Sequence, residues 1–254
     1  MSDTLYLSLW YPNLRLEALG EKLCAVLGAF AAHGGEARVY SATVWPVSWS
    51  EAPVFERVYG RMSGEAGSNA GAEPRHAVQE ALELLHEDYA YEFQIGWSLW
   101  ELEAGDDGTP GSEMASAHLS AAQDTQSAPR SATDDKPKLV TQNRTPHLIN
   151  QIAAGRWVRG SRMVRVTGYG PLFEEGAYEQ DGHIRIDFGS DAPFLEEGAD
   201  LDQVGARHVE ENVRQLVELA GGVEKASGAT ARLLWSELGE SLAQRLAERL
   251  GIRN

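Results

Sequence analysis

The sequence predicts an α+β protein with a mostly antiparallel, mixed sheet and about four flanking helices. Short segments in which apolar and polar residues alternate recur along the chain, and this period is typical of half-buried strands. Between them lie segments whose apolar residues recur every three or four positions, the period of amphipathic helices. Hydrophobic residues make up 43% of the 254 residues, which is enough for a sizeable core.

The first half of the chain is expected to follow the order β-α-β-β-α-β. Its clearest strand is 91–100, where alternation is complete and predicts a central position in the sheet. The other expected elements are strands over 5–10, 38–47 and 54–59 and helices over 14–33 and 74–86. This order is that of the ferredoxin-like split βαβ unit, a fold that hosts many unrelated functions.

A hairpin with a long acidic connection is the best-patterned sheet element of the second half. Its expected strands are Met163–Tyr169 and His183–Gly189. A helix over Arg207–Ala220 should follow, with Gly221 and Gly222 as its stop. A last strand over Thr230–Trp235 and a closing helix marked by leucines at every fourth position complete the expected elements.

Three regions are expected along the chain. Residues 1–103 form the first α+β half and residues 139–254 the second, packed with the first as one compact unit. Residues 104–138 are rich in Asp, Gly, Ser, Thr and Ala and have little to bury, so they are interpreted as a disordered insertion or linker. The alternative is that this segment joins two separate lobes.

The charge of the chain limits the classes of partner. A formal net charge of −16 disfavours nucleic acid and anionic membranes, because both are bound by clustered Lys and Arg. It is compatible with a cationic protein partner, and equally with a charge that serves solubility alone. No apolar stretch approaches the roughly 20 residues of a membrane span. The acidity concentrates in residues 171–218, which contain thirteen acids and three arginines.

The compartment and source are also indicated by composition. A single cysteine, Cys24, allows no disulfide framework, and the N-terminus has no signal-peptide pattern, so the cytoplasm is the expected compartment. Arginine outnumbers lysine by 18 to 4, which suggests a bacterial source.

Polar residues on the second strand of the hairpin form one candidate site. A period of two places His183, Arg185 and Asp187 on one face, and Arg165 can lie across the hairpin from them. A histidine with an aspartate to orient it can transfer protons, and the arginines can bind an anion. The competing interpretation is a solvated sheet face with cross-strand ion pairs.

Tryptophans and acids supply the other candidate binding residues. Trp10 and Trp100 are expected on the faces opposite the apolar stripes of their strands, where they pack in a core that covers the second face of the sheet. The alternative is that they line a pocket or an aromatic contact surface. Within the acidic segment the candidate binding residues are Glu174, Glu175, Glu196 and Glu197.

The function predicted from these features is non-enzymatic protein binding. The chain has no P-loop, no G-x-G-x-x-G, no G-x-S-x-G and no H-E-x-x-H motif, so no catalytic residue, metal site or cofactor is predicted. An acidic module with aromatic anchors, similar in character to immunity and antitoxin proteins, is the leading hypothesis. The alternative is a small-molecule-binding protein or hydrolase, with a pocket formed by the tryptophans and the face of His183, Arg185 and Asp187.

Overall fold

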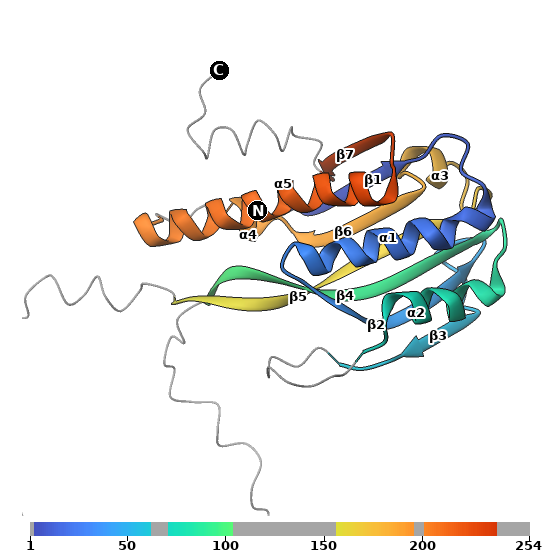
Figure 1. Cartoon of the computed structure of the whole chain (residues 1–254), viewed down its shortest axis with the longest axis horizontal. Helices are drawn as coiled ribbons and strands as arrows, with labels where there is room; N and C mark the ends of the chain where they lie inside the picture. The colour runs from blue at the N-terminus through green and yellow to red at the C-terminus, as the bar shows by residue number, and fades with distance from the viewer. Residues whose placement is uncertain (1–2, 62–70, 104–155, 196–200, 238–254) are drawn as a thin grey trace, which may run out of the picture. The chain divides into compact units, whose positions relative to one another are not determined.

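The protein has an α+β fold built on one antiparallel sheet of seven strands (Figure 1). The computed structural model describes residues 3–61, 71–103, 156–195 and 201–237, so the insertion predicted over 104–138 and the predicted closing helix lie outside the described residues. The described residues within 1–101 and 157–254 form one compact unit.

The strands and helices occupy the following ranges. The strands are β1 Thr4–Trp10, β2 Gly35–Pro46, β3 Phe55–Val58, β4 Tyr89–Glu103, β5 Arg156–Tyr169, β6 Ile184–Ser190 and β7 Ala231–Ser236. The α-helices are α1 Leu19–Ala32, α2 Pro74–Ala81, α3 Ala177–Gln180, α4 Ala192–Leu195 and α5 Gln203–Ser227. Two 3₁₀ turns, η1 Leu16–Ala18 and η2 Leu82–Leu84, adjoin α1 and α2.

The strands are arranged in the sheet in the order β3-β2-β4-β5-β6-β1-β7. The first half does follow the chain order β-α-β-β-α-β, but the ferredoxin-like arrangement is not confirmed. β1 pairs with β6 and β7, both from the second half, and does not adjoin β2, β3 or β4. The alternation of apolar residues specifies which face of a strand is buried, but it does not specify which strand pairs with it. The partners of β1 therefore could not be predicted from its pattern.

The predicted hairpin is confirmed. β5 and β6 pair antiparallel with Arg165 opposite Asp187 and Thr167 opposite Arg185. The intervening pairs, such as Val166 with Ile186, point to the other face and are fully buried. The polar candidate residues therefore lie on the sheet face that points away from the main core.

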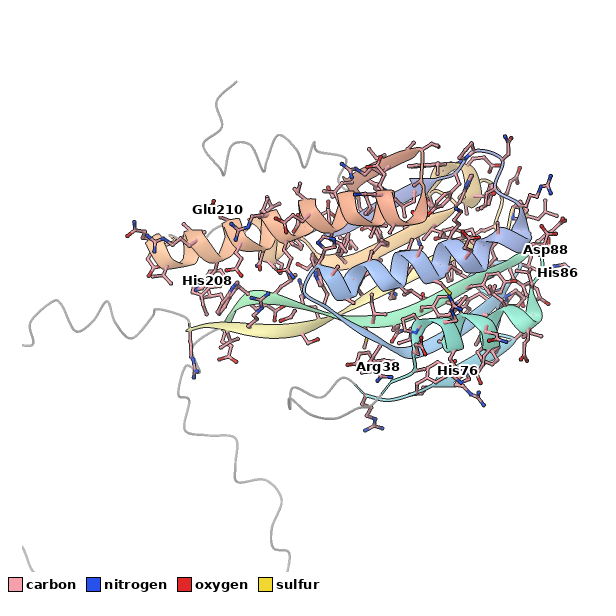
Figure 2. All side chains as sticks on the ribbon, viewed as in Figure 1. Arg38, His76, His86, Asp88, His208 and Glu210 are labelled. Atoms are coloured by element: carbon pink, nitrogen blue, oxygen red, sulfur yellow. The ribbon has the colours of Figure 1, made fainter. Side chains whose placement is uncertain are left out.

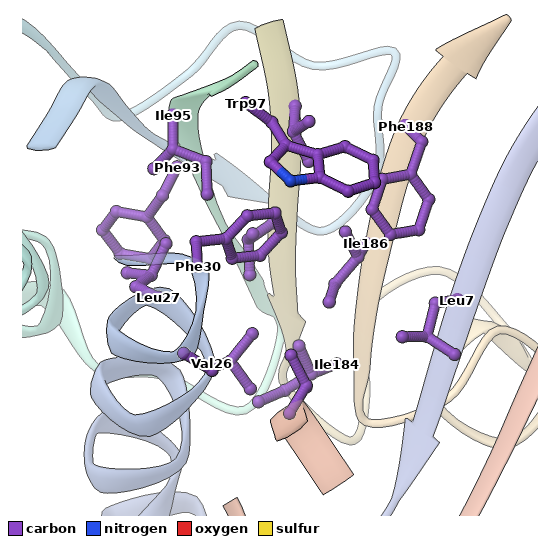
Figure 3. Packing of buried hydrophobic residues seen from close by; sticks show 14 of the residues in the cluster. Leu7, Val26, Leu27, Phe30, Phe93, Ile95, Trp97, Ile184, Ile186 and Phe188 are labelled. Carbon is purple, nitrogen blue, oxygen red and sulfur yellow. The ribbon is translucent and has the colours of Figure 1, made fainter. Parts of the chain in front are cut away.

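Three helices cover one face of the sheet. Figure 1 shows α1, α2 and α5 on the same side, and α1 contacts both of the others. Between them and the sheet lies the main core, in which Trp97 of β4 meets Phe30 of α1 and Phe188 of β6 (Figure 3). The alternation predicted for β4 is confirmed, since its core-facing residues from Tyr91 to Leu99 are buried.

The long helix α5 continues past its predicted stop. Gly221 and Gly222 lie inside it, and it ends at Gly228, whose φ of 73° is the left-handed conformation of a helix C-cap. A Cβ atom built on Gly222 would lie 2.3 Å from His33 Nε2, so this glycine allows α5 to approach the end of α1 closely. Gly222 thus serves the packing of α5 against the end of α1, and the predicted end of the helix at the glycine pair was wrong.

Candidate functional site

Three loops meet at one end of the sheet and form a surface that we name the acidic loop end. They are residues 47–54, 85–88 and 170–183, and they contain seven acids and no lysine or arginine. The backbone N–H of Val47 donates to the carbonyl of Asp88 (2.7 Å), and that of Leu172 donates to the carbonyl of Glu87 (2.9 Å). Figure 2 shows His86 and Asp88 at this end, far from His208 and Glu210 on α5.

Two strained residues join these loops. Val47 has a φ of 58° and Glu174 a φ of 41°, both in the left-handed region that side chains other than glycine rarely adopt. The N–H of Glu174 donates to the carbonyl of Val47 at 2.9 Å, so the two residues are directly linked. Such a conformation costs about 1–3 kcal/mol per residue and persists where the surroundings enforce it, as at ligand-binding loops.

A close approach of backbones also shapes this end. A Cβ atom on Gly170 would lie 2.3 Å from the carbonyl oxygen of Glu87, so only glycine fits between the loops here. The N–H of Gly170 donates to the carbonyl of Tyr89 at 2.7 Å. The loop that follows β5 is therefore held against the start of β4.

An aromatic cluster adjoins the acidic loop end and includes Trp49 and Phe173 from its loops. The ring of Trp49 packs edge-on against Trp45, Tyr169 and Phe173, with centroids 5.1 to 6.3 Å apart. Tyr169 and Phe173 are buried, and this cluster is separate from the main core. In the same loops, Val47 is 56%, Leu172 61% and Val54 47% exposed. The acidic loop end therefore presents apolar side chains to solvent among its acids.

His183 lies at the rim of the acidic loop end as a hydrogen-bond acceptor. Its Nδ1 accepts the backbone N–H of Tyr11 at 3.1 Å, and its ring stacks on Tyr178 with centroids 4.0 Å apart. Burial lowers the pKa of His183, against the smaller opposing influence of Glu179. The neutral imidazole fits this arrangement, because protonation of Nδ1 would remove the acceptor.

Asp187 has partners other than His183. One carboxylate oxygen accepts from Arg165 at 2.5 Å and the other accepts from the backbone N–H of Gly189 at 2.7 Å. These hydrogen bonds of His183 and Asp187 thus go to other partners: His183 accepts from Tyr11, and Asp187 accepts from Arg165 and Gly189. Arg165 and Asp187 make the cross-strand ion pair that the register of β5 and β6 dictates.

Arg185 connects the sheet face to the acidic loop end. It forms an ion pair with Asp181 at 2.5 Å, and its guanidinium lies over the rings of Tyr6 (5.3 Å) and Tyr169 (5.5 Å). Tyr6 in turn stacks on Trp235 with centroids 4.6 Å apart. Burial raises the pKa of Tyr6 to about 12, so it is a neutral donor at physiological pH.

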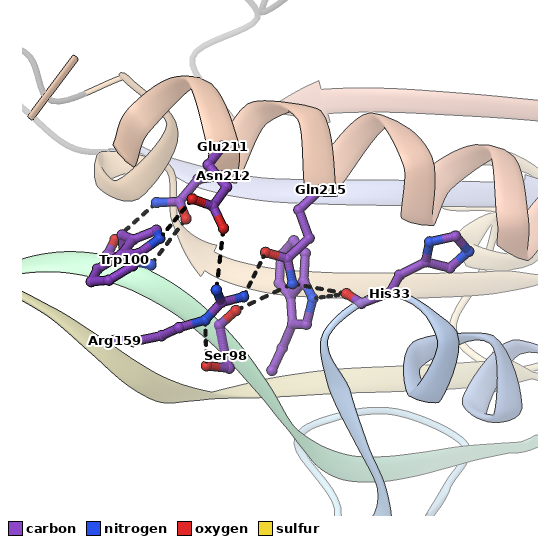
Figure 4. A network of polar contacts seen from close by, with 8 residues as sticks. His33, Ser98, Trp100, Arg159, Glu211, Asn212 and Gln215 are labelled. Carbon is purple, nitrogen blue, oxygen red and sulfur yellow. Dashed lines mark hydrogen bonds and ion pairs between the residues drawn. The ribbon is translucent and has the colours of Figure 1, made fainter. Parts of the chain in front are cut away.

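The two candidate tryptophans lie in different places. Trp10 donates from Nε1 to the carbonyl of Glu179 at 3.0 Å and so belongs to the acidic loop end. Trp100 instead contacts α5, and the centroids of its ring and that of His208 are 3.9 Å apart. Its Nε1 donates to Glu211 (Figure 4). The remaining tryptophans divide between the main core, the aromatic cluster, β5 and the edge strand β7, rather than lining one pocket.

The structure therefore brings most of the predicted binding residues to one region. Those at the acidic loop end or on the adjoining sheet face are Trp10, Arg165, Glu174, Glu175, His183, Arg185 and Asp187. Trp100 lies apart from them. Glu196 and Glu197 lie outside the described residues.

Two contributors to this region, Val47 and Leu172, were not predicted from the sequence. An exposed apolar residue in a loop belongs to no periodic pattern. A left-handed backbone conformation is usually predicted from a glycine, and Val47 adopts it without one. The signal that could have located the region is charge: the acids of all three loops lie in stretches without Lys or Arg.

A groove of about 780 Å³ lies elsewhere, between α1 and α2. Cys24 lines it together with Gly20, Val78 and Leu82. Burial raises the pKa of the Cys24 thiol, with a smaller lowering by Arg75, so the thiolate that a nucleophile needs is disfavoured. The groove offers apolar walls and no activated group.

The described residues show neither a metal-binding cluster nor a membrane-spanning helix. Within them, no three His, Cys, Asp or Glu side chains gather as ligands of a metal ion. No helix in the described ranges is both long enough and apolar enough to cross a membrane. Comparisons of the chain with protein-family models, with curated proteins and with solved structures gave no match.

Proposed function

We propose that the protein binds another protein through the acidic loop end, and that the partner presents a basic surface. The observation that carries this proposal is the composition of the three joined loops, which hold seven acids and no Lys or Arg around the exposed side chains of Val47 and Leu172. Apolar contacts ringed by charge are typical of protein interfaces.

The rigidity of the loops supports a binding role. The hydrogen bonds between the loops and the packing of Trp49 against Phe173 hold the surface in one shape before a partner arrives. A preordered surface loses less conformational entropy on association and therefore binds more tightly for the same contacts. The strain at Val47 and Glu174 fits a surface that the fold maintains for recognition.

The charge of the protein supports the choice of partner. A net charge of −16 attracts cationic proteins and speeds their encounter, and the acidic loop end concentrates that attraction near the apolar contacts. Neutralisation of a cationic partner by an acidic, non-catalytic protein is the mode of action expected of an immunity-like or antitoxin-like protein.

Site-specific photo-crosslinking tests the proposed surface. We expect benzoylphenylalanine at Leu172 to crosslink a specific protein in the host lysate, because this side chain is 61% exposed at the centre of the proposed contact. The matched control carries the same group at Val217 on α5, which is 55% exposed. A product from position 172 absent from position 217 supports the proposal; equal products from both positions, or none from 172, contradict it.

A further inference from the structure

His183 lies where three segments of the chain meet at the rim of the acidic loop end. Its backbone N–H donates to the carbonyl of Leu9 at 2.9 Å, and its carbonyl accepts from the N–H of Tyr169 at 3.0 Å. Its Nδ1 accepts from the backbone N–H of Tyr11 at 3.1 Å. His183 therefore connects the loop of residues 170–183 both to the end of β1 and to the end of β5.

The helix α3, which belongs to the same loop, makes further contacts beside this histidine. The ring of Tyr178 stacks on that of His183 with centroids 4.0 Å apart, and Tyr178 also packs against the aromatic cluster. The carbonyl of Glu179 accepts from Nε1 of Trp10 at 3.0 Å. The ring of Tyr11 lies on the other side of β1's end, with its centroid 6.1 Å from that of the imidazole. These contacts fix the imidazole so that its Nδ1 is directed at one backbone amide.

The hydrogen bond from Tyr11 exists in only one charge state of the imidazole. A neutral imidazole with its proton on Nε2 presents the lone pair of Nδ1 to the Tyr11 N–H. In an imidazolium both nitrogens carry protons, so neither can accept, and rotation of the ring offers only another N–H or a C–H. Protonation therefore brings two donors face to face at the point where the loop is joined to β1.

The surroundings of His183 favour the neutral form. Among the described residues, the titratable and charged groups of the elements around it are Tyr11, Lys22, Tyr169, Tyr178, Glu179, Asp181 and Arg185. Asp181 and Arg185 compensate each other as an ion pair at 2.5 Å. Burial lowers the pKa of His183, and Glu179 opposes this with a smaller effect. The closed loop therefore binds a proton at this position less readily than an exposed histidine does.

We propose that His183 is a pH-sensitive switch for the acidic loop end: the neutral imidazole holds residues 177–183 against β1, and the protonated imidazole releases them. The released loop carries an ordinary histidine and binds the proton more strongly, so its population rises as the pH falls below about 6.5. The same loop carries Leu172, Glu174 and Glu175. Release weakens partner binding, a consequence that rests on the proposed function, because a loop that must be reordered loses conformational entropy on association.

Amide hydrogen exchange of the free, full-length chain, followed by NMR between roughly pH 7.5 and pH 5, tests the switch. We expect the protection factor of the Tyr11 amide to fall at least about threefold at the lower pH. The imidazole nitrogen signals of His183 should show the proton on Nε2 at neutral pH. The amide of Trp100, which donates to Asn212, is the internal control and should keep its protection.

Two variants separate the acceptor from the ring. His183→Asn places an amide oxygen close to the position of Nδ1 and accepts at any pH, so the protection of Tyr11 should be the same at both pH values. His183→Phe keeps a ring that can stack on Tyr178 but has no acceptor, so the protection should be low at both. Protection of Tyr11 that does not change with pH in the wild type, an equal loss in His183→Asn or at Trp100, or a proton on Nδ1 at neutral pH would overturn the switch.

Crosslinking from position 172 at two pH values separates the switch from the proposed function. The product should fall at least about threefold between roughly pH 7.5 and pH 5.5, whereas the same chain carrying His183→Asn should keep it. No product at either pH would contradict the proposed function and leave the exchange result, which is measured on the free chain, standing. Equal product at both pH values would overturn the control of binding by this loop.

Discussion

The Trp97→Ala variant is expected to lose about 4 kcal/mol of its free energy of unfolding, within the range typical for removal of a buried tryptophan. The indole is fully buried and packs against Phe30, Phe188 and Phe194, with ring centroids 5.2 to 6.2 Å apart. Its Nε1 also donates to the carbonyl of His33 at 2.9 Å. Truncation therefore opens a cavity where α1, β4 and β6 meet and removes a partly buried hydrogen bond.

Urea denaturation followed by circular dichroism measures this loss. Trp97→Phe keeps part of the packing and should cost about half as much, whereas Val217→Ala, at a 55% exposed position, should change stability by less than about 0.5 kcal/mol. A loss below about 1 kcal/mol for Trp97→Ala would contradict the central place of this side chain in the core.

The Asn212→Asp variant is expected to lose about 3 kcal/mol or more. Asn212 of α5 is fully buried; its Oδ1 accepts from the N–H of Trp100, and its Nδ2 donates to the carbonyls of Trp100 (2.8 Å) and Pro193 (2.9 Å) (Figure 4). Aspartate keeps the size of the side chain but directs a carboxylate oxygen at two carbonyl oxygens. Two buried acceptors then lose their donor, and a charge is buried without compensation.

Thermal and urea unfolding at pH 7 measure this effect, with Glu210→Gln on the exposed side of α5 as the control. The control should differ from the wild type by less than about 0.5 kcal/mol. The loss in Asn212→Asp should shrink at low pH, where a protonated carboxyl regains one donor. A variant as stable as the wild type at pH 7 would show that Asn212 does not hold α5 to β4.

The sheet could be predicted where one strand alone carries the information. Complete alternation in β4 and the two valines of β5 specify buried faces, and a hairpin pairs neighbours in the chain. The partners of β1 could not be predicted, because Leu5, Leu7 and Leu9 would be buried on the same face whichever strand paired with β1. The end of α5 was missed because Gly222 meets His33, a contact far away in the sequence.

The candidate site could be predicted in part for similar reasons. Arg165 and Asp187 were placed together because the hairpin sets their register, and Glu174 and Glu175 were identified from charge alone. Trp100 lies against α5 because its backbone N–H donates to the side chain of Asn212. No local sequence pattern predicts a contact between residues so far apart in the chain.

Salt-dependent capture of a partner from the host lysate tests the proposed binding role most directly. We predict that the tagged wild-type chain retains one stoichiometric basic protein at roughly 50 mM salt and releases most of it at roughly 500 mM, since salt screens charge attraction. Glu174→Gln/Glu175→Gln should retain at least fivefold less at the lower salt concentration. The matched variant Glu210→Gln/Glu218→Gln, which removes two exposed acids from α5, should retain as much as the wild type. Retention that is equal in both double variants, or unchanged by salt, would contradict binding through the acidic loop end.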